Sequence, residues 1–222
     1  MEEINVIIPA YNEQETIGAV IDLVHECNLK SKVIVVDNNS TDNTSKVAKE
    51  KGATVVECKL KGKGYAMEVG FQNVTSDVIV YLDADIIDYH SNIIHLLADP
   101  ILNDECDLVK STFERDSGGV VTEIATKPLL NVLFPDMYKY KEPLSGMIAG
   151  KKSFFEKIVF EKDYGVDISI IIDAYKLNAK VKEVNIGKFE NISHLKKTDE
   201  VMRNMAFEVI KAIIKKHDEI SK

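Results

Sequence analysis

The stretch that most constrains the fold is an apolar run, residues 78–82, that leads directly into Asp83-Ala84-Asp85. A short run of β-branched and aromatic residues is typical of a buried strand, which places Asp83 and Asp85 at its carboxyl end. Ligands of open α/β sheets bind at that edge. Two carboxylates on alternate residues repel each other unless a cation lies between them, and a divalent ion that carries a nucleotide diphosphate would meet this need. Two solvated aspartates in a loop remain the alternative on spacing alone.

Length, charge and cysteine usage narrow the class of protein. The 222 residues suffice for one substantial domain, and the net charge of −8 argues against a nucleic-acid partner, which clustered Lys and Arg would hold. The cysteines at 27, 58 and 106 show no Cys-x-x-Cys spacing and are typical of reduced thiols in a cytoplasmic protein. The chain enters directly at a strand without a signal segment, and we expect no membrane span.

Strands and helices alternate along the first half of the chain. The hydrophobic patterns predict strands at residues 4–8, 32–37, 53–58, 78–82, 108–115 and 182–188, and helices at 14–27, 46–49, 65–73 and 199–216. Residues 163–175 are expected to begin as a turn and continue as a helix. This alternation predicts an α/β fold with a Rossmann-like, mostly parallel sheet flanked by helices, in a single domain over residues 1–222.

In such a sheet, four polar loops would meet at one edge: residues 9–13, 37–42, 61–64 and 83–85. Asn12, Glu13 and Asp37 could accept hydrogen bonds from a ribose or a base. The basic segment that contains Gly62 and Lys63 could approach a base or diphosphate closely, since glycine lets the backbone come near a ligand. Each loop alone could be a solvated turn, but together they favour a nucleotide-sugar site.

These four motifs resemble the nucleotide-binding half of the family-2-type glycosyltransferases, which have the A-type glycosyltransferase fold. The resemblance covers about residues 4–90. It implies that residues 1–90 bind the donor and that Asp85, with Asp83, holds Mg²⁺ or Mn²⁺ against the diphosphate. The expected nucleotide-sugar-binding residues are Pro9, Ala10, Tyr11, Asn12, Glu13, Asp37, Asn38, Gly62, Lys63, Asp83 and Ala84.

Residues 91–222 are expected to form the acceptor-binding half and a C-terminal helix. This half is similar to the glucosyl-3-phosphoglycerate and mannosyl-3-phosphoglycerate synthases, through segments 109–113, 121–130, 143–146 and 164–167, and His194 before a basic run.

The similarity to these synthases implies a role for several residues of the second half. His194 would complete the metal site with Asp85, Asp167 would meet the hydroxyls of the donor sugar, and Thr122 would help to bind the acceptor phosphate. We further expect Lys110 to act with Asp85 and Asp167 in catalysis, and Ser145 and Gly146 to contact the acceptor. The chain departs from the branch at two positions: Val120 replaces an arginine that binds acceptor phosphate, and Asp167 replaces a glutamate.

The sequence therefore predicts a metal-dependent glycosyltransferase that moves a hexose from a nucleoside diphosphate sugar, of the UDP-glucose or GDP-mannose type, to a small anionic acceptor such as 3-phosphoglycerate. If the anomeric configuration were inverted, Asp167 or Glu123 would be the candidate base. A polyprenyl phosphate acceptor is the nearest alternative, and a non-catalytic nucleotide-sugar-binding protein is an alternative of another class. The sequence leaves a homodimer open.

Overall fold

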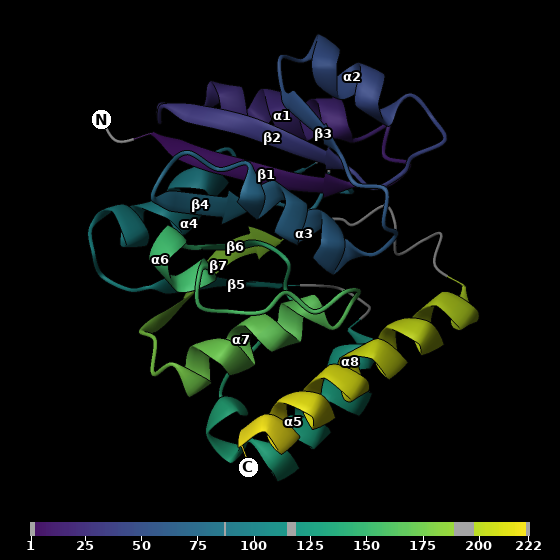
Figure 1. Ribbon diagram of the computed structural model, residues 1–222. Helices are drawn as coiled ribbons and strands as arrows, with labels where there is room; N and C mark the ends of the chain where they lie inside the picture. Colours follow the sequence, from purple (N-terminus) through teal and green to yellow (C-terminus); the bar gives the residue numbers. More distant parts are fainter. Residues whose placement is uncertain (1–2, 87, 115–118, 189–197, 221–222) are drawn as a thin grey trace.

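One seven-stranded sheet lies at the centre of the computed structural model, which describes residues 3–86, 88–114, 119–188 and 198–220. The strands are β1 (Ile4–Ala10), β2 (Ser31–Asp37), β3 (Thr54–Glu57), β4 (Val78–Tyr81), β5 (Leu108–Glu114), β6 (Ile148–Lys151) and β7 (Val181–Lys188). They lie in the order β3-β2-β1-β4-β6-β5-β7, and only β6 runs antiparallel to its neighbours. The predicted α/β fold with a mostly parallel sheet is confirmed (Figure 1).

Helices cover both faces of this sheet (Figure 1). The described helices are α1 (Ile17–Glu26), α2 (Thr44–Glu50), α3 (Lys63–Gln72), α4 (Ile93–Leu102), α5 (Lys127–Leu133), α6 (Lys152–Phe155), α7 (Val166–Lys176) and α8 (Asp199–Ile220), with a π-helical turn η1 (Val121–Thr126) and a 3₁₀ turn η2 (Pro135–Met137). Helices α1 and α4 pack on one face, and α3, α6, α7 and α8 belong to the core of the other.

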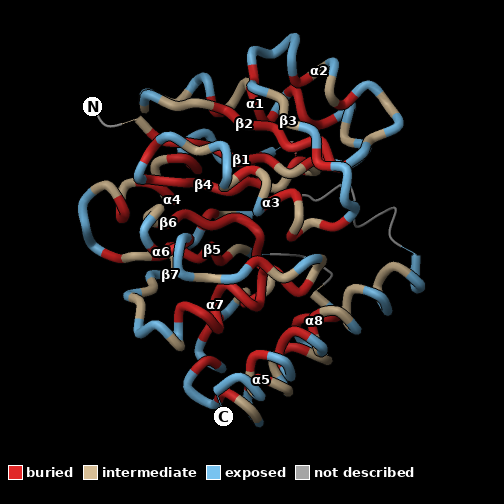
Figure 2. The backbone as a smooth tube through the Cα atoms, viewed as in Figure 1, coloured by how far each residue is buried: buried red, intermediate tan, exposed pale blue. Residues whose placement is uncertain are grey.

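The period-two alternation of strand side chains explains these two cores. In β1, Val6 and Ile8 belong to the core that contains α1 and α4, whereas Ile7 belongs to the core that contains α3 and α7. Successive side chains of a strand point to opposite faces, so a central strand must be apolar on both. Figure 2 accordingly shows the central strands as buried.

Strand β6 and helix α4 are among the elements that the sequence patterns do not predict. Strand β6 follows a glycine-bearing turn and has only four residues, which is too short for a recognisable alternation. Helix α4 carries Pro100 in its interior, a residue that usually ends a helix. Tertiary packing overrides these local signals, since Ile148 and Ala149 of β6 and most of α4 are buried.

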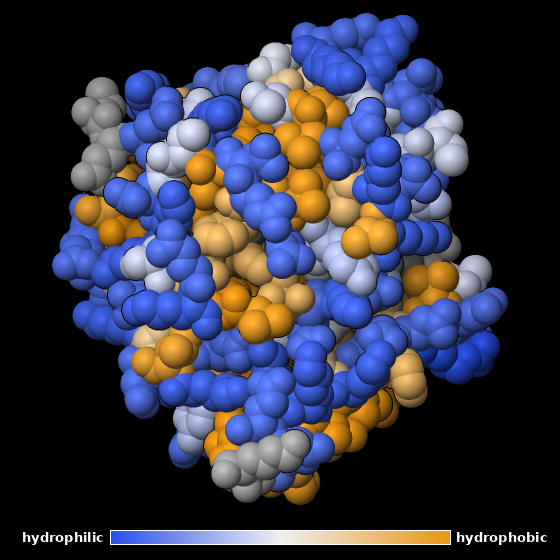
Figure 3. Space-filling view, in the orientation of Figure 1, coloured by the Kyte–Doolittle hydropathy of each residue, from blue (hydrophilic) through white to orange (hydrophobic). Residues whose placement is uncertain are grey.

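The surface is mostly polar, with separate apolar areas. In Figure 3 hydrophilic residues cover most of the visible face, and hydrophobic residues also gather low on the molecule, where α5 and α8 lie. The large exposed apolar side chains of this region include Val132 of α5, Phe207, Ile214 and Ile220 of α8, and Ile124 of η1. Among the described residues, no helix combines the length and apolar character that a membrane span needs.

The packing of α3 on the sheet gives a first testable prediction. A Cβ added at Gly70 would lie 2.4 Å from Cγ2 of Ile7 and 3.1 Å from Cγ2 of Val36. Gly70→Ala should therefore lower the free energy of unfolding by about 1–3 kcal/mol through overpacking, measured by urea denaturation.

The matched control is Gly18→Ala in α1, where the nearest atoms, on Lys51 and Val47, lie at 3.4 Å. It should stay within about 1 kcal/mol of the wild type, because alanine has the better helix propensity. Equal stabilities of the two variants would contradict the close packing of α3 on β1 and β2.

Candidate active site

The loops after β1 and β2 are joined by hydrogen bonds at the carboxyl edge of the sheet. The backbone N–H of Asn12 donates to Oγ of Ser40 (3.0 Å), and its side-chain oxygen accepts from the N–H of Thr41 (2.8 Å). The N–H of Glu13 donates to Oγ1 of Thr44 (2.8 Å). Asn12 has a φ of 56°, which asparagine tolerates better than most residues. These bonds bring together the first two of the four predicted loops.

Asn38 fixes the third loop to the second. Its Nδ2 donates to the carbonyl oxygen of Leu60 (2.6 Å), and its Oδ1 accepts from the N–H of Gly62 (2.8 Å). Next to it, the carboxylate of Asp37 accepts from the N–H of Ser40 (2.8 Å) and from Oγ of Ser45. Asp37 and Asn38 are both buried, so they form the inner part of this edge of the sheet. Tyr11 is 43% exposed, and the ammonium of Lys61 lies 5.0 Å from its ring centroid.

The side chain of Lys63 connects the acidic motif to the second half of the chain. Its Nζ donates to Oδ1 of Asp83 (3.0 Å) and to Oδ2 of Asp167 (2.9 Å). Burial would lower the pKa of Lys63, but the carboxylates of Asp167 and Asp83 outweigh burial and raise it well above its usual value. The ammonium is therefore a fixed positive charge between two predicted site residues that lie far apart in sequence.

Gly146 comes close to this ion-paired group. A Cβ at this position would lie 2.2 Å from Nζ of Lys63 and 2.6 Å from Oδ1 of Asp83. Only a residue without a side chain leaves room for the ion pair here. The neighbouring Ser145 is buried, and its hydroxyl shares a 2.5 Å hydrogen bond with the hydroxyl of Ser111.

Lys110 is fully buried and contacts residues next to this ion pair. Its Nζ donates to the carbonyl oxygens of Ser145 (2.6 Å) and Asp167 (3.3 Å). Burial lowers its pKa to about 8, and the positive charge of Lys63 adds to this effect, while the carboxylate of Asp167 opposes it. Lys110 therefore ties the Ser145-Gly146 turn to the first turn of α7.

One carboxylate oxygen of this cluster is buried without a partner. Asp167 lies in the first turn of α7 and is 6% exposed, and its Oδ1 has no hydrogen bond in the structure. A buried acceptor without a partner costs free energy unless a ligand satisfies it. The hydroxyl group of a bound ligand could supply the missing donor.

The acidic motif offers ligands of the kind that Mg²⁺ and Mn²⁺ prefer. Asp83 and Asp85 are partly exposed, and burial together with the charges of both carboxylates raises the pKa of the nearby Tyr89. Tyr89 donates its hydroxyl to the carbonyl oxygen of Asp83 (3.0 Å). Carboxylate oxygens suit these cations, so Asp83 and Asp85 fit a divalent ion.

A complete protein-only metal site is not present among the described residues, where no three His, Cys, Asp or Glu side chains are grouped to hold a metal ion. The predicted ligand His194 lies outside the described residues. Mg²⁺ usually keeps several waters and substrate oxygens as ligands, so two carboxylates are compatible with such a site.

The structure thus brings together Lys63, Asp83, Lys110, Gly146 and Asp167, whereas Thr122 lies in another element, η1. The side chain of Thr122 is buried at 3% exposure within η1, and the preceding Val120 is 53% exposed. Glu123 pairs with Lys127 (2.5 Å) on the exposed side of the same turn, which leaves Asp167 as the better placed of the two candidate bases.

Ser111 and Tyr89 are not among the site residues predicted from the sequence. Ser111 follows Lys110 on β5, and a search for polar residues on a buried strand could have found it. Tyr89 carries no local signal, because it lies outside the described helices and strands and contacts Asp83 through its hydroxyl.

Comparisons with known proteins agree with this geometry. Residues 5–163 match the family model described as glycosyl transferase family 2. The chain is 30% identical to a glucosyl-3-phosphoglycerate synthase of Petrotoga mobilis, over 99% of this chain and 75% of that protein. It is 33% identical to the glucosyl-3-phosphoglycerate synthase of Mycolicibacterium smegmatis, over 83% of this chain and 68% of that protein.

Solved structures support the same relationship. The crystal structure of glucosyl-3-phosphoglycerate synthase from Mycobacterium tuberculosis in complex with Mn²⁺, UDP-glucose and phosphoglyceric acid has a TM-score of 0.89 and 31% identity. The match covers 98% of this chain and 80% of that one. A complex of the same enzyme with Mg²⁺ and UDP has a TM-score of 0.89 and 29% identity, with the same coverage.

The lowered pKa of Lys110 predicts a pH dependence of stability. Below pH 8 the lysine is protonated in the folded and unfolded states, and its buried charge destabilises the fold. Between about 8 and its ordinary 10.5 the folded state has lost the proton that the unfolded state keeps, so stability rises with pH. The unfolding free energy of the wild type minus that of Lys110→Met should rise by roughly 3 kcal/mol over this window.

Urea denaturation of both proteins at several pH values between about 7.5 and 10.5 would measure this difference. Titrations of groups that do not interact with Lys110 cancel because both proteins share them. A difference that stays constant or falls with pH would contradict a buried, destabilised ammonium at Lys110.

Proposed function

The chain belongs to glycosyl transferase family 2, and from this premise we propose that it transfers glucose from UDP-glucose to 3-phosphoglycerate with the help of Mg²⁺ or Mn²⁺. The observation that carries the proposal is the convergence of Lys63, Asp83 and Asp167 beside Gly146. The relatives that support it are glucosyl-3-phosphoglycerate synthases, one of them in complex with Mn²⁺, UDP-glucose and phosphoglyceric acid. Residues 1–90 form the nucleotide-sugar half in this proposal, and residues 91–222 form the acceptor half with the C-terminal helix.

The donor would lie along the carboxyl edge of β1, β2 and β4. Tyr11, Asp37 and Asn38 would contact the nucleoside, with Pro9, Ala10, Asn12, Glu13, Gly62 and Ala84 around it. Asp85, with Asp83, would hold the divalent ion together with His194, and such an ion supplies Lewis-acid stabilisation for the charge on the leaving diphosphate. The ammonium of Lys63 pairs with Asp83 and Asp167 and would stabilise negative charge beside them.

Asp167 would bind the hydroxyl groups of the donor sugar. Its buried Oδ1 lacks a hydrogen bond, so a sugar hydroxyl donating to it would remove an energetic cost and orient the ring. The acceptor would lie against Ser145 and Gly146, with Thr122 near its phosphate. Lys110 would hold this turn and α7 in place through the two carbonyl oxygens that it contacts.

We also propose a cytoplasmic location, supported by the free thiols of Cys27, Cys58 and Cys106, which an oxidising compartment would tend to couple. The exposed apolar side chains of Ile124, Val132 and Phe207 would suit a homodimer. Light scattering would test this oligomeric state.

A donor and acceptor screen tests the proposed reaction. UDP-glucose and GDP-mannose are incubated with the protein, with and without Mn²⁺ or Mg²⁺, each alone and with 3-phosphoglycerate, and nucleoside diphosphate release is measured. We expect metal-dependent turnover of UDP-glucose that 3-phosphoglycerate accelerates. Asp85→Ala should reduce kcat by about 100-fold or more, because charge stabilisation on the leaving group is lost.

Asp22→Ala is the matched control, since Asp22 lies on α1 and pairs with Lys51 at the surface. It should turn over substrate like the wild type. Donor turnover without any response to 3-phosphoglycerate would contradict this acceptor and favour a polyprenyl phosphate. Metal-dependent binding of UDP-glucose without turnover under any condition would favour the non-catalytic alternative.

A further inference from the structure

The C-terminal helix α8 lies along α7, the helix that carries Asp167. Nζ of Lys216 in α8 donates to both carboxylate oxygens of Asp173 in α7, at 2.8 and 2.6 Å, and both residues are buried. Further along, Nζ of Lys176 pairs with Glu219 (2.8 Å). Breaking a buried pair leaves an uncompensated charge, so these contacts hold the two helices in one relative position.

The same helix also touches the start of α7 at very short range. A Cβ added at Gly165 would lie 2.7 Å from Cβ of Ala212 and 2.9 Å from the carbonyl oxygen of Glu208, both in α8. Gly165 is buried and has an ordinary helical φ of −67°, so a missing side chain, and not an unusual backbone conformation, is what this contact requires. Two residues later in the chain comes Asp167.

The segment before Gly165 links α8 to the loop of Lys63. We call residues 161–165 the strut. At one side, Glu161 of the strut pairs with Lys215 of α8 (2.6 Å). At the other, a Cβ on Gly64 would lie 1.5 Å from the carbonyl oxygen of Glu161, and one on Gly62 would lie 2.4 Å from that of Lys162.

Hydrogen bonds reinforce the contact between the strut and the Lys63 loop. The N–H of Tyr65 donates to the carbonyl oxygen of Lys162 (3.3 Å). Within the strut, the carboxylate of Asp163 accepts from the N–H of Tyr164 (3.0 Å). Burial is the main influence on Asp163 and raises its pKa. Gly62 and Gly64 lack side chains, so their backbone lies close to the backbone of the strut. Gly165 likewise lets the strut approach the backbone of α8.

We propose that Gly165 and the strut are positioning elements, through which α8 sets the position of the Lys63 ammonium and of Asp167 in the active site. Neither Gly165 nor α8 belongs to the predicted site residues. The continuous path runs from Ala212 and Glu208, through Gly165 and Glu161, to Gly64 and Lys63. A displacement of α8 therefore moves the groups that bridge the donor and acceptor halves. The catalytic part of this inference rests on the proposed function.

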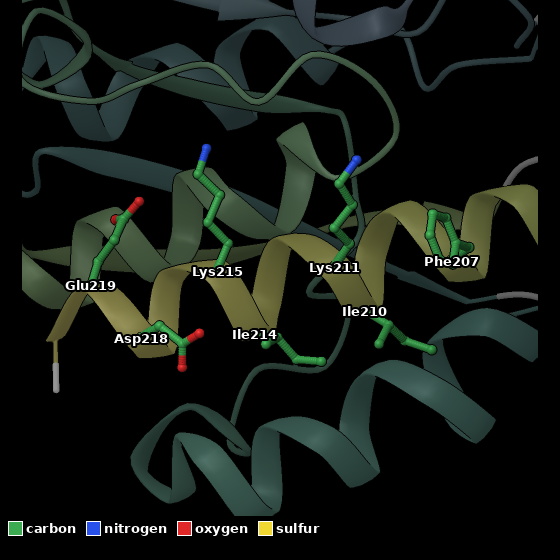
Figure 4. A pocket seen from close by; sticks show the side chains of 7 residues that line it. All are labelled: Phe207, Ile210, Lys211, Ile214, Lys215, Asp218 and Glu219. Atoms are coloured by element: carbon green, nitrogen blue, oxygen red, sulfur yellow. The ribbon is translucent and has the colours of Figure 1, made fainter.

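Lys215 of α8 reaches the strut and also borders a groove on α8. Figure 4 shows Lys211, Lys215 and Glu219 pointing to one side of α8, and Ile210, Ile214 and Asp218 pointing to the other. Lys215 is the member of this set that reaches the strut. The groove itself is lined by α8 residues alone and contains none of the residues placed in the active site.

The experiment is a steric pair of substitutions with two readouts. Gly165→Ala should push α8 and the strut apart, and Ala212→Gly in the same chain should make room for the new methyl group. The first readout is kcat per folded molecule with UDP-glucose, Mn²⁺ and 3-phosphoglycerate. The second is the rate at which an amine-reactive reagent labels Lys63, measured by mass spectrometry relative to the exposed Lys46.

For Gly165→Ala we expect a kcat lower by about tenfold or more, because small misplacements of site residues are costly, and faster labelling of Lys63 by about threefold or more. In the double variant Gly165→Ala/Ala212→Gly, kcat should rise and the labelling of Lys63 should slow, each part of the way to the wild-type value. Only the close contact with the Glu208 carbonyl oxygen then remains. Gly18→Ala is the matched control and should leave both readouts unchanged. A purely structural role for Gly165 would lower the melting temperature but leave kcat per folded molecule and labelling at wild-type values, which would overturn the inference.

Two further outcomes are informative. If Gly165→Ala does not fold, Lys215→Met replaces it in the experiment. The side chain of Lys215 is 50% exposed, and its removal breaks the ion pair with Glu161. Unchanged labelling of Lys63 in that variant would overturn the inference. If the wild type shows no turnover but labelling responds as expected, the proposed reaction fails while the positioning role stands.

Discussion

The ion pairs that the Lys63 ammonium makes with Asp83 and Asp167 join the two halves of the molecule at the carboxyl edge of the sheet. Asp83 follows the central strand β4, and Asp167 lies in the first turn of α7. The side chains of Lys63 and Asp167 are mostly buried, so the attraction between them is screened less than a surface pair would be. The position of this one cation therefore depends on the first half, the second half and the loop that carries it.

The rest of the site is arranged so that this group has room and support. Gly146 lacks the side chain that would displace Lys63, and Lys110 holds the turn of Gly146 against α7 from below. The strut supports the Lys63 loop from the side of α8. Glycine at these contacts is required by close approach, since the conformational cost of glycine would otherwise disfavour it.

Local sequence patterns were sufficient to predict the fold class and the meeting of the polar loops at one edge of the sheet. Apolar runs that end in polar residues predict strands whose carboxyl ends meet, and the hydrogen bonds of Asn12 and Asn38 show the loops meeting there. The pairing of Lys63 with Asp167 could not be predicted, because 104 residues separate them and no periodicity relates a loop to a distant helix. The same holds for Gly165, which looks like an ordinary turn glycine until α8 is packed against it.

The most direct test of this account is a double-mutant cycle on the unfolding free energy with Lys63→Met, Asp167→Asn and the double variant. If the ammonium truly couples the two halves, the effects of the single changes should be non-additive by about 1 kcal/mol or more, with the double variant less destabilised than their sum. Additivity within about 0.5 kcal/mol would mean that Lys63 and Asp167 do not interact in solution, and it would contradict the account.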